Sequence, residues 1–233
     1  MEHTIRAIAH IQSDFPEKFG IPRQAGLVEE LEARVVFTQD FRNPDALRGL
    51  EGFSHIWLIW QFSEALREGW SPTVRPPRLG GNTRVGVFAT RSPFRPNALG
   101  LSCVRLLGVE RDGALGPVLR VAGADLMDGT PIFDIKPYLP YADCRPEASG
   151  GFAPDGGERL TVRYAPGAEA LIPPEKRAAL TGVLANDPRP RYQKDPERVY
   201  RLDFAGLTVS FSVDDGVLTV TGTEKTENEE TET

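Results

Sequence analysis

The chain lacks the residue patterns that build metal centres, disulfide frameworks and membrane spans. Two cysteines among 233 residues, Cys103 and Cys144, give neither a metal-ligand spacing nor a disulfide framework, and the three histidines show no metal spacing. No run of about 18 apolar residues occurs, so no membrane span is predicted. The first residues do not form a basic segment followed by an apolar one, as an export signal requires. We therefore expect a cytoplasmic protein without a metal.

Two nucleotide-binding fingerprints are also missing. Gly80, Gly81 and Gly86 do not form G-x-G-x-x-G, and no G-x-x-x-x-G-K-[ST] motif occurs. Both motifs place glycines where the backbone must approach a phosphate. The sequence therefore supports neither a Rossmann cofactor site nor a Walker phosphate site.

Turn-forming residues are present in quantity. The chain has 20 Pro and 23 Gly, and they separate short apolar segments of the kind that form strands. This pattern predicts a mainly β fold with some α, with the N-terminal part arranged as a barrel or sandwich. The expected strands of this part are residues 4–12, 33–38, 53–62, 83–90, 101–110, 118–122 and 132–136.

The composition changes after residue 142, where a segment rich in Pro, Gly, Ser and Ala is interpreted as a linker. Beyond it, one helix and a three-stranded meander predict a small α+β domain. The final segment has five Glu and one Lys, a net of −4 within the chain's −6, and is predicted to be disordered. The expected division is residues 1–142, linker 143–159, domain 160–223 with helix 173–186 and strands 198–204, 207–213 and 217–221, and tail 224–233.

The most unusual charge pattern lies in residues 70–108, which contain six arginines and no Asp, Glu or Lys. Guanidinium groups bind carboxylates and phosphates through a fixed fork of donors, so this stretch predicts an anion site. Arg91 ends an apolar segment and begins a Ser-Pro-x-x-Pro loop that also holds Arg95. Its partner is either a ligand or an acid from elsewhere in the fold.

Two other segments carry groups suited to chemistry. Asp128 and Asp134 place two carboxylates around an Asp-Gly-Thr-Pro turn, which has a purely structural interpretation as well. Residues 187–194 form a stiff, basic loop that contains Tyr192. That loop is either a solvated linker or a surface that contacts phosphates.

Together these segments resemble a known family, the TsaA-like (TrmO-type) tRNA methyltransferases. The resemblance covers nearly the whole chain except the acidic tail, and such long uninterrupted matches are highly specific. The matching segments are Glu17-Lys18-Phe19-Gly20-Ile21-Pro22-Arg23-Gln24, residues 49–55, 70–82, 86–97 and 125–138, and Asp187-Pro188-Arg189-Pro190 with Tyr192.

The resemblance implies a β-barrel catalytic domain unlike Rossmann methyltransferases, with S-adenosylmethionine as methyl donor. It also implies a homodimer with the cofactor site near the subunit interface, and methylation of the amino nitrogen of threonylcarbamoyladenosine beside the anticodon of tRNA. Where the family often has a His-polar pair, this chain reads Ser63-Glu64, which leaves backbone contacts as the expectation there. The other cofactor contacts carry over to Pro22, Arg23, Gln24, Arg91, Leu101, Asp128, Gly129, Thr130 and Pro131.

Methyl transfer from a sulfonium is an in-line displacement that needs alignment and a proton acceptor but no protein nucleophile. Asp134 or Tyr138 is our hypothesis for the proton acceptor. Arg91 is expected to bind the cofactor's carboxylate or a tRNA phosphate. The side chains expected to contact tRNA are Arg95, Arg189, Arg191 and Lys194.

Two other functions are compatible with the sequence. One is a non-catalytic RNA- or ligand-binding β module that keeps the scaffold, which the departure at Ser63-Glu64 favours. The other is an S-adenosylmethionine-dependent enzyme that acts on a different small acceptor.

Overall fold

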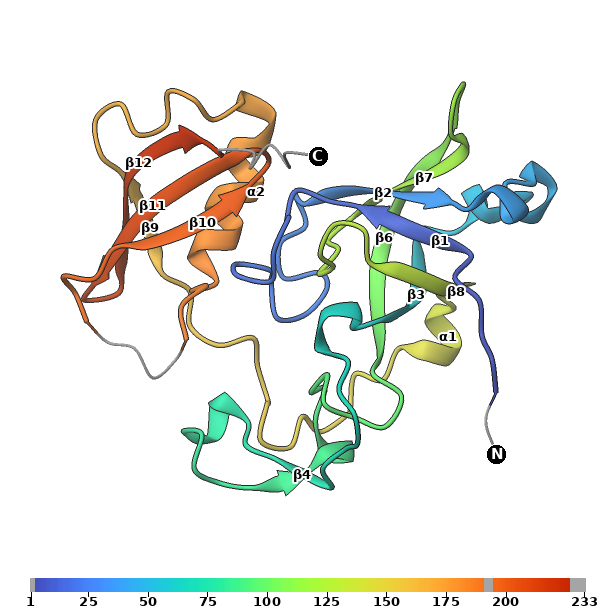
Figure 1. Cartoon of the computed structure of the whole chain (residues 1–233), viewed down its shortest axis with the longest axis horizontal. Coiled ribbons are helices and arrows are strands. Elements are labelled where there is room, and N and C mark those ends of the chain that lie inside the picture. The colour runs from blue at the N-terminus through green and yellow to red at the C-terminus, as the bar shows by residue number, and fades with distance from the viewer. Residues whose placement is uncertain (1–2, 191–194, 227–233) are drawn as a thin grey trace.

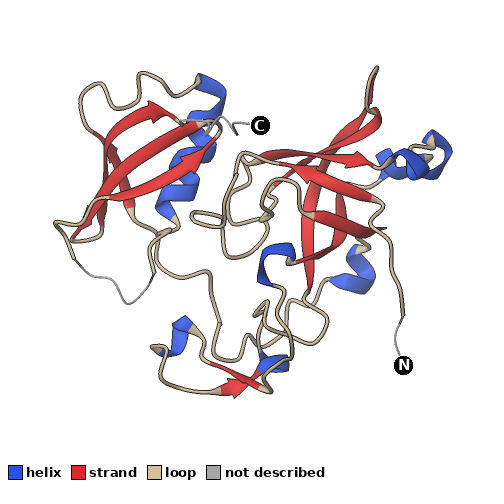
Figure 2. Ribbon diagram, viewed as in Figure 1, coloured by secondary structure: helices blue, strands red, loops and turns tan. Residues whose placement is uncertain are grey.

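The computed structural model describes residues 3–190 and 195–226, and strands dominate both of its halves (Figures 1 and 2). In the N-terminal half six strands pair side by side, each antiparallel to its neighbours, in the order β1-β2-β7-β6-β3-β8. Pairing of β8 back to β1 closes them into a barrel. The strands are β1 (Ala9–Gln12), β2 (Glu32–Phe37), β3 (His55–Gln61), β6 (Leu99–Asp112), β7 (Gly116–Ala122) and β8 (Pro131–Pro137).

Alternating side chains explain why these strands enclose a core. Along β3, Ile56, Leu58 and Trp60 are buried, whereas the residues between them are only partly covered. Successive side chains of a strand point to opposite faces, so one face of β3 lines the barrel interior. The prediction of a mainly β protein is confirmed.

The C-terminal half is a four-stranded sheet covered by one helix. The strand order is β10-β11-β12-β9, with β9 parallel to β12 and the other pairs antiparallel. The helix and the meander match the predicted segments within a few residues, but β9 lies in a stretch that was not predicted to form a strand. The elements are β9 (Thr161–Tyr164), α2 (Pro174–Ala185), β10 (Tyr200–Phe204), β11 (Leu207–Asp214) and β12 (Val217–Lys225).

An N-terminal segment, residues 13–31, packs into the core of the C-terminal half (Figure 1). The Phe15 and Phe204 rings meet edge to face with centroids 5.4 Å apart. A Cβ on Gly182 of α2 would lie 2.6 Å from Val28, so the helix and this segment are in close contact. The two halves therefore share one of the two apolar cores of the molecule.

The expected strand at residues 83–90 is wrong for most of its length. Only Val85–Gly86 (β5) is extended, paired with Thr73–Val74 (β4) at the base of a projecting arm, and a 3₁₀ turn, η6 (Val87–Ala89), follows. Phe88 is 72% exposed on that turn. The apolar residues of this segment therefore do not belong to a buried strand.

The strand expected at residues 4–12 forms only at Ala9–Gln12. Its neighbour β2 ends at Phe37, and the chain then enters a 3₁₀ turn, η1 (Gln39–Phe41), so β1 cannot extend further along β2. The disordered tail was expected from residue 224, but Glu224 and Lys225 pair with β11. Residues 227–233 lie outside the described part.

Short helical elements connect the strands. A four-residue helix, α1 (Pro140–Asp143), follows β8 directly. Within the described residues, no helix is long and apolar enough to cross a membrane. The remaining 3₁₀ turns are η2 (Pro44–Leu47), η3 (Leu50–Gly52), η4 (Ser63–Ala65) and η5 (Pro77–Leu79).

Candidate functional site

A cavity of about 750 Å³ lies at the end of the barrel where β3 ends and β6 begins. Its volume is within the range of cavities that hold a drug-sized ligand. Five stretches of chain form its walls, and they are far apart in the sequence. They are residues 18–24, residues 59–65, residues 90–95, residues 99–101 and part of the segment from Asp125 to Thr130.

Most of the side chains predicted to contact a cofactor lie on this cavity. Leu101 is 56% exposed at its wall, and Thr130 is buried in it. Arg95, which was predicted to contact tRNA, lines the same space. The predicted cofactor residues on the cavity wall are Pro22, Arg23, Gln24, Ser63, Glu64, Arg91, Leu101 and Thr130.

Arg91 has a partner from a distant part of the chain, as the absence of nearby acids required. Its Nη1 donates a hydrogen bond to Oε1 of Gln24, and the Gln24 amide donates to the carbonyl of Arg23. Arg23 in turn donates from Nη2 to the carbonyl of Arg189 at 3.2 Å. A line of polar groups thus runs from the cavity to the C-terminal half.

The residues of the Asp-Gly-Thr-Pro turn have different positions relative to the cavity. The Asp128 carboxylate accepts from the backbone N–H of Ser13 at 2.9 Å, and Gly129 has φ of 74°, a conformation that favours glycine. Asp128, Gly129 and Pro131 are not on the cavity wall, whereas Thr130 is. The Asp128 side chain holds the turn against the segment after β1.

Neither residue hypothesised as the proton acceptor lies on the cavity wall. Asp134 is in β8, where its carboxylate pairs with Nζ of Lys136 at 2.9 Å. Tyr138 sits beside Trp57, with ring centroids 5.9 Å apart, on the outward face of β3. Partial burial raises the pKa of the Tyr138 phenol, which keeps it neutral near pH 7.

The basic loop near the C-terminus is described only in part. Arg189 is held by Asp187, whose two oxygens accept from Nε at 2.8 Å and from Nη2 at 3.0 Å, and its side chain is 13% exposed. Asp187 has φ of 52°. Arg191 and Lys194 lie outside the described residues.

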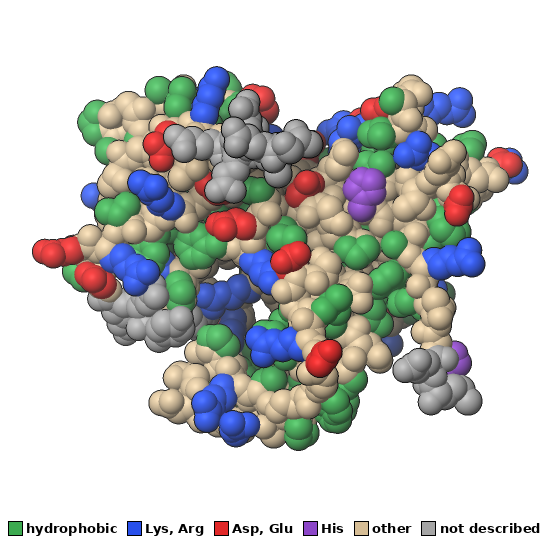
Figure 3. Space-filling view, in the orientation of Figure 1, with side chains coloured by type: hydrophobic (Ala, Val, Ile, Leu, Met, Phe, Trp, Pro, Cys, Tyr) green, Lys and Arg blue, Asp and Glu red, His purple; other side chains and the backbone are tan. Residues whose placement is uncertain are grey.

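Other arginines of the acid-free stretch do not converge on the cavity. Arg78 pairs with Asp155 at 3.6 Å, so the distant acid comes from the expected linker. Arg84 is exposed on the arm and donates to Thr73 Oγ1 at 3.0 Å. Figure 3 shows Lys and Arg side chains gathered at a hollow between the two halves and the arm.

Sequence reasoning missed a buried polar chain behind the cavity. The Trp60 indole donates to Ser102 Oγ at 2.9 Å, and Ser102 Oγ donates to Asp125 Oδ1 at 2.5 Å. Burial raises the pKa of the Asp125 carboxyl, and the hydrogen bond from Ser102 and the charge of Arg91 oppose that rise. These three residues come from two strands and a loop, so no local motif shows their proximity.

Two family models match the chain. The model for the tRNA-methyltransferase O N-terminal domain matches residues 10–144, and the TrmO C-terminal domain model matches residues 157–226. The chain belongs to the tRNA-methyltransferase O family. The first match covers the whole barrel except the first residue of β1, and the second covers the sheet and helix of the C-terminal half.

Relatives of this tRNA-methyltransferase O family member carry names that agree. A protein of Escherichia coli (strain K12) named tRNA (adenine(37)-N6)-methyltransferase is 45% identical over 199 residues, 82% of this chain and 83% of the relative. A Pseudomonas aeruginosa protein named putative S-adenosylmethionine-dependent methyltransferase RcsF is 42% identical over 217 residues, 90% of this chain and 92% of the relative. The crystal structure of TrmO from Pseudomonas aeruginosa superposes with a TM-score of 0.78 and 33% identity, covering 96% of this chain and 99% of that one.

The cavity of this tRNA-methyltransferase O protein suits S-adenosylmethionine. That molecule has a carboxylate, a positive sulfur and an aromatic base. The guanidinium of Arg91 can meet the carboxylate, and the buried carboxyl of Asp125 supplies negative charge in the same space. Ile59, Phe62 and Leu101 add apolar wall against which a base can pack. Within the described residues, no three His, Cys, Asp or Glu side chains are grouped as a metal site would need.

Proposed function

We propose that this protein methylates N6 of the threonylcarbamoyladenosine at position 37 of tRNA, with S-adenosylmethionine as donor. The observation that carries the proposal is the cavity lined by the Arg91–Gln24–Arg23 contacts, in a chain 45% identical to a tRNA (adenine(37)-N6)-methyltransferase. When bound, S-adenosylmethionine supplies a methyl group activated by its positive sulfur. The protein's own task is then alignment, exclusion of water and removal of one proton.

Three parts of the cavity would hold the donor. Arg91 would bind its carboxylate, with Gln24 fixing the guanidinium through a hydrogen bond. The backbone around Ser63 and Glu64, at the end of β3, would contact it on the other side. The turn that includes Thr130 would close the base of the site, while Asp128, Gly129 and Pro131 act by shaping that turn.

The charge balance of the cavity supports the threonylcarbamoyl group as part of the substrate. Lys18, Arg23, Arg91 and Arg95 are the cationic side chains on the wall among the described residues, against the carboxylates of Glu64 and Asp125. The donor brings one carboxylate, but its sulfonium and ammonium groups make it positive overall, so cationic groups remain in excess. The carboxylate of the threonyl group would neutralise one of them, and Arg95 is our choice for that contact.

The tRNA would lie across both halves. In this proposal, residues 1–142 hold the donor and the reacting base, residues 143–159 connect, and residues 160–223 contribute phosphate contacts from the loop with Arg189, Arg191 and Lys194. Arg189 is already committed to Asp187, so its part is to shape the loop as well as to add charge. In this proposal the protein acts on tRNA in the cytoplasm.

We also propose a homodimer whose interface lies near the cavity. Large apolar side chains are exposed on the arm and on the cavity wall, including Trp70 at 54%, Phe88 at 72% and Leu101 at 56%. Trp70 and Phe88 stack with centroids 6.0 Å apart. Such a patch is typical of a surface that another subunit covers. Sedimentation equilibrium should give twice the chain mass, and a Phe88→Asp variant should shift it toward the monomer.

Incubation with labelled S-adenosylmethionine tests the proposed reaction. Transfer to tRNA that carries the threonylcarbamoyl group, and not to tRNA without it, is the expected result. Binding of the donor without transfer to either tRNA would favour an enzyme for a different acceptor. Absence of donor binding would favour a non-catalytic module.

A further inference from the structure

Two carboxylates line the cavity among the described residues, and they differ in how firmly they are held. Glu64 is exposed in η4. Lys18 Nζ donates a hydrogen bond to its backbone carbonyl at 2.5 Å, and not to its side chain. Asp125 is held through its side chain by Ser102, which is only 1% exposed. Only Asp125 therefore has an orientation fixed by the fold.

The direction of each hydrogen bond in the chain behind Asp125 follows from its first member. The Trp60 indole nitrogen can only donate, so Ser102 Oγ accepts from it. The single hydroxyl hydrogen of Ser102 is then directed to Asp125 Oδ1. This arrangement requires an acceptor oxygen on Asp125, which an ionised carboxylate provides. The backbone N–H groups of Ala25 and Asp125 also donate to this carboxyl, and the lone pairs of a carboxylate outnumber these three donors.

Trp60 is itself fixed by tight packing. A Cβ on Gly100 would lie 2.3 Å from the Trp60 ring, so the ring lies directly against the β6 backbone. Trp60 also packs against Phe62, with centroids 4.3 Å apart. The hydrogen bond to Ser102 thus starts from a tightly packed side chain. Ser102, together with the backbone N–H groups of Ala25 and Asp125, orients the Asp125 carboxyl.

The charges around Asp125 come from several elements. Arg91, from the loop after η6, favours the ionised carboxyl, and the remaining charged side chains on the wall are Lys18, Arg23, Glu64 and Arg95. Burial acts against ionisation and is the larger effect, so the pKa of Asp125 is raised above its usual value. A carboxylate with a raised pKa is a stronger base, which suits proton transfer near neutral pH.

We propose that Asp125 is the proton acceptor in the methyl transfer and that Ser102 is its positioning residue. This inference rests on the proposed function. The N6 nitrogen forms a bond to the methyl carbon while the carbon–sulfur bond breaks and its electron pair goes to sulfur. The N6–H electron pair stays on nitrogen, and the proton moves to the carboxylate of Asp125, which later releases it to water.

The test compares Asp125→Asn with Glu64→Gln and Asp134→Asn in the full-length protein. Asparagine keeps the size of the side chain and still accepts from Ser102, so folding should be preserved. We expect the single-turnover rate of Asp125→Asn, measured at saturating S-adenosylmethionine, to fall about 10²- to 10⁴-fold. The Asp125 carboxyl also supplies negative charge near the donor, so the Kd for S-adenosylmethionine is measured in parallel and should rise by a smaller factor than the rate falls. In the wild type, the rate should fall at low pH as Asp125 becomes protonated, and this acidic limb of the pH–rate profile should be lost in Asp125→Asn. Glu64→Gln and Asp134→Asn should keep it.

The Ser102→Ala variant tests whether Ser102 acts through Asp125. A merely structural role of Ser102 would leave the pH dependence of the rate unchanged. Loss of its hydrogen bond removes an interaction that lowers the Asp125 pKa, so the acidic limb should shift to higher pH. Carbon-13 NMR of the Asp125 carboxyl in the ligand-free protein should show the same upward shift. The Asp125 carboxyl signal is identified by its absence from the spectrum of Asp125→Asn.

Four results would overturn the assignment. Two concern Asp125→Asn: a wild-type rate and pH profile, or a loss of donor binding without a slower chemical step. The third is the loss of the acidic limb in Glu64→Gln or Asp134→Asn instead. The fourth is a titration of the Asp125 carboxyl that Ser102→Ala leaves unchanged. Failure of the wild-type protein to methylate modified tRNA would overturn the proposed function, and the assignment with it. Transfer by the wild type with any of the four results would overturn the assignment alone.

Discussion

Arg91 shows how far single residues could be interpreted from the sequence. Its position in a stretch without acids indicated that it binds a ligand or a distant group, and the structure brings it to Gln24 on the cavity wall. Asp125 could not be found in this way. Its importance depends on burial and on Ser102 and Trp60, which come from other strands, so local patterns carry no trace of it.

Replacement of Arg91 by Ala should weaken donor binding with little effect on the fold. A hydrogen bond to a charged group contributes about 1.5–3 kcal/mol, which corresponds to roughly 10- to 100-fold in Kd. Calorimetric titration with S-adenosylmethionine measures the change. Arg105→Ala is the matched control, because Arg105 is an exposed arginine of the same stretch and does not line the cavity. Equal Kd values for the two variants would contradict the role of Arg91.

At the scale of elements, strands with an alternating core face were predictable and strands without a partner were not. The apolar segment at residues 53–62 forms β3, one face of which is buried in the barrel. Residues 83–90 were also expected to form a strand, but they lie on the arm, where β5 pairs with the two residues of β4. Pairing partners depend on the whole chain, so the local sequence could not separate the two cases.

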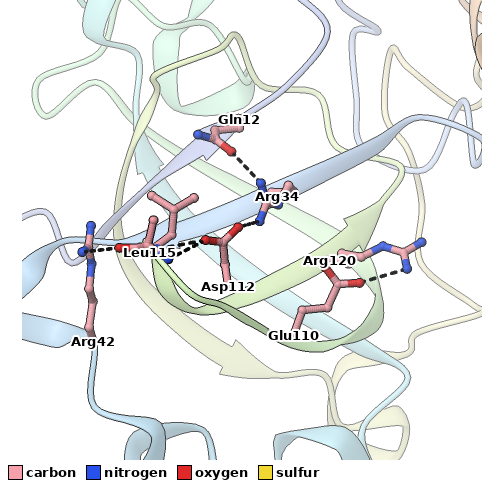
Figure 4. Close-up of polar contacts among 8 residues, drawn as sticks. Gln12, Arg34, Arg42, Glu110, Asp112, Leu115 and Arg120 are labelled. Carbon is pink, nitrogen blue, oxygen red and sulfur yellow. Dashed lines mark hydrogen bonds and ion pairs between the residues drawn. The ribbon is translucent and has the colours of Figure 1, made fainter.

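Ion pairs link β2, β7 and β6, which lie side by side in that order in the barrel (Figure 4). Arg34 of β2 donates to Asp112, at the end of β6, at 2.8 Å, and Arg120 of β7 pairs with Glu110 at 3.1 Å. The hydrogen bond from Arg34 is the main cause that lowers the pKa of Asp112 to about 2. Asp112 also accepts from the backbone N–H groups of Ala114 and Leu115, both at 3.0 Å.

The Asp112→Asn variant should therefore show a pH-dependent loss of stability. A carboxyl with a lowered pKa stabilises the fold above its unfolded pKa of about 3.9, and this contribution is lost as the pH falls toward 2. Thermal melts should give a lower Tm than wild type at pH 7 and a difference that shrinks between about pH 5 and pH 2. Asp40→Asn, at an exposed site, serves as control. A Tm difference that does not depend on pH would argue against the ion pair.

At the scale of the molecule, the two halves are less separate than the sequence indicated. Residues 13–31 lie within the N-terminal family match, yet Phe15, Val28 and Leu31 are in the apolar core of the C-terminal half. Lys176 of α2 also pairs with Asp14 at 2.5 Å. The same segment carries Pro22, Arg23 and Gln24 to the cavity, so the C-terminal half supports the donor site. Contacts between segments this far apart could not be predicted from composition.

Gly20 is the position at which this support can be tested. It has φ of 92°, and a Cβ there would lie 2.1 Å from Cδ1 of Leu202, which is fully buried. Gly20→Ala should cost about 1–3 kcal/mol of unfolding free energy from overpacking and should weaken donor binding by displacing the segment. Gly49→Ala has the same kind of backbone, with φ of 89°, but no atom within 4 Å of the added Cβ.

Chemical denaturation and donor titration of both glycine variants separate the two effects. Gly49→Ala should lose only the stability that belongs to backbone strain and should bind the donor as wild type does. If Gly20→Ala bound S-adenosylmethionine with unchanged affinity, the C-terminal half would not support the site.

The central claim is methyl transfer to one modified nucleoside. Mass spectrometry of nucleosides from tRNA incubated with the protein and S-adenosylmethionine tests it most directly. We expect the threonylcarbamoyladenosine signal to be replaced by one heavier by a single methyl group, with fragmentation that places the methyl on N6. An unchanged threonylcarbamoyladenosine signal, or a methyl group on unmodified adenosine 37, would contradict the account.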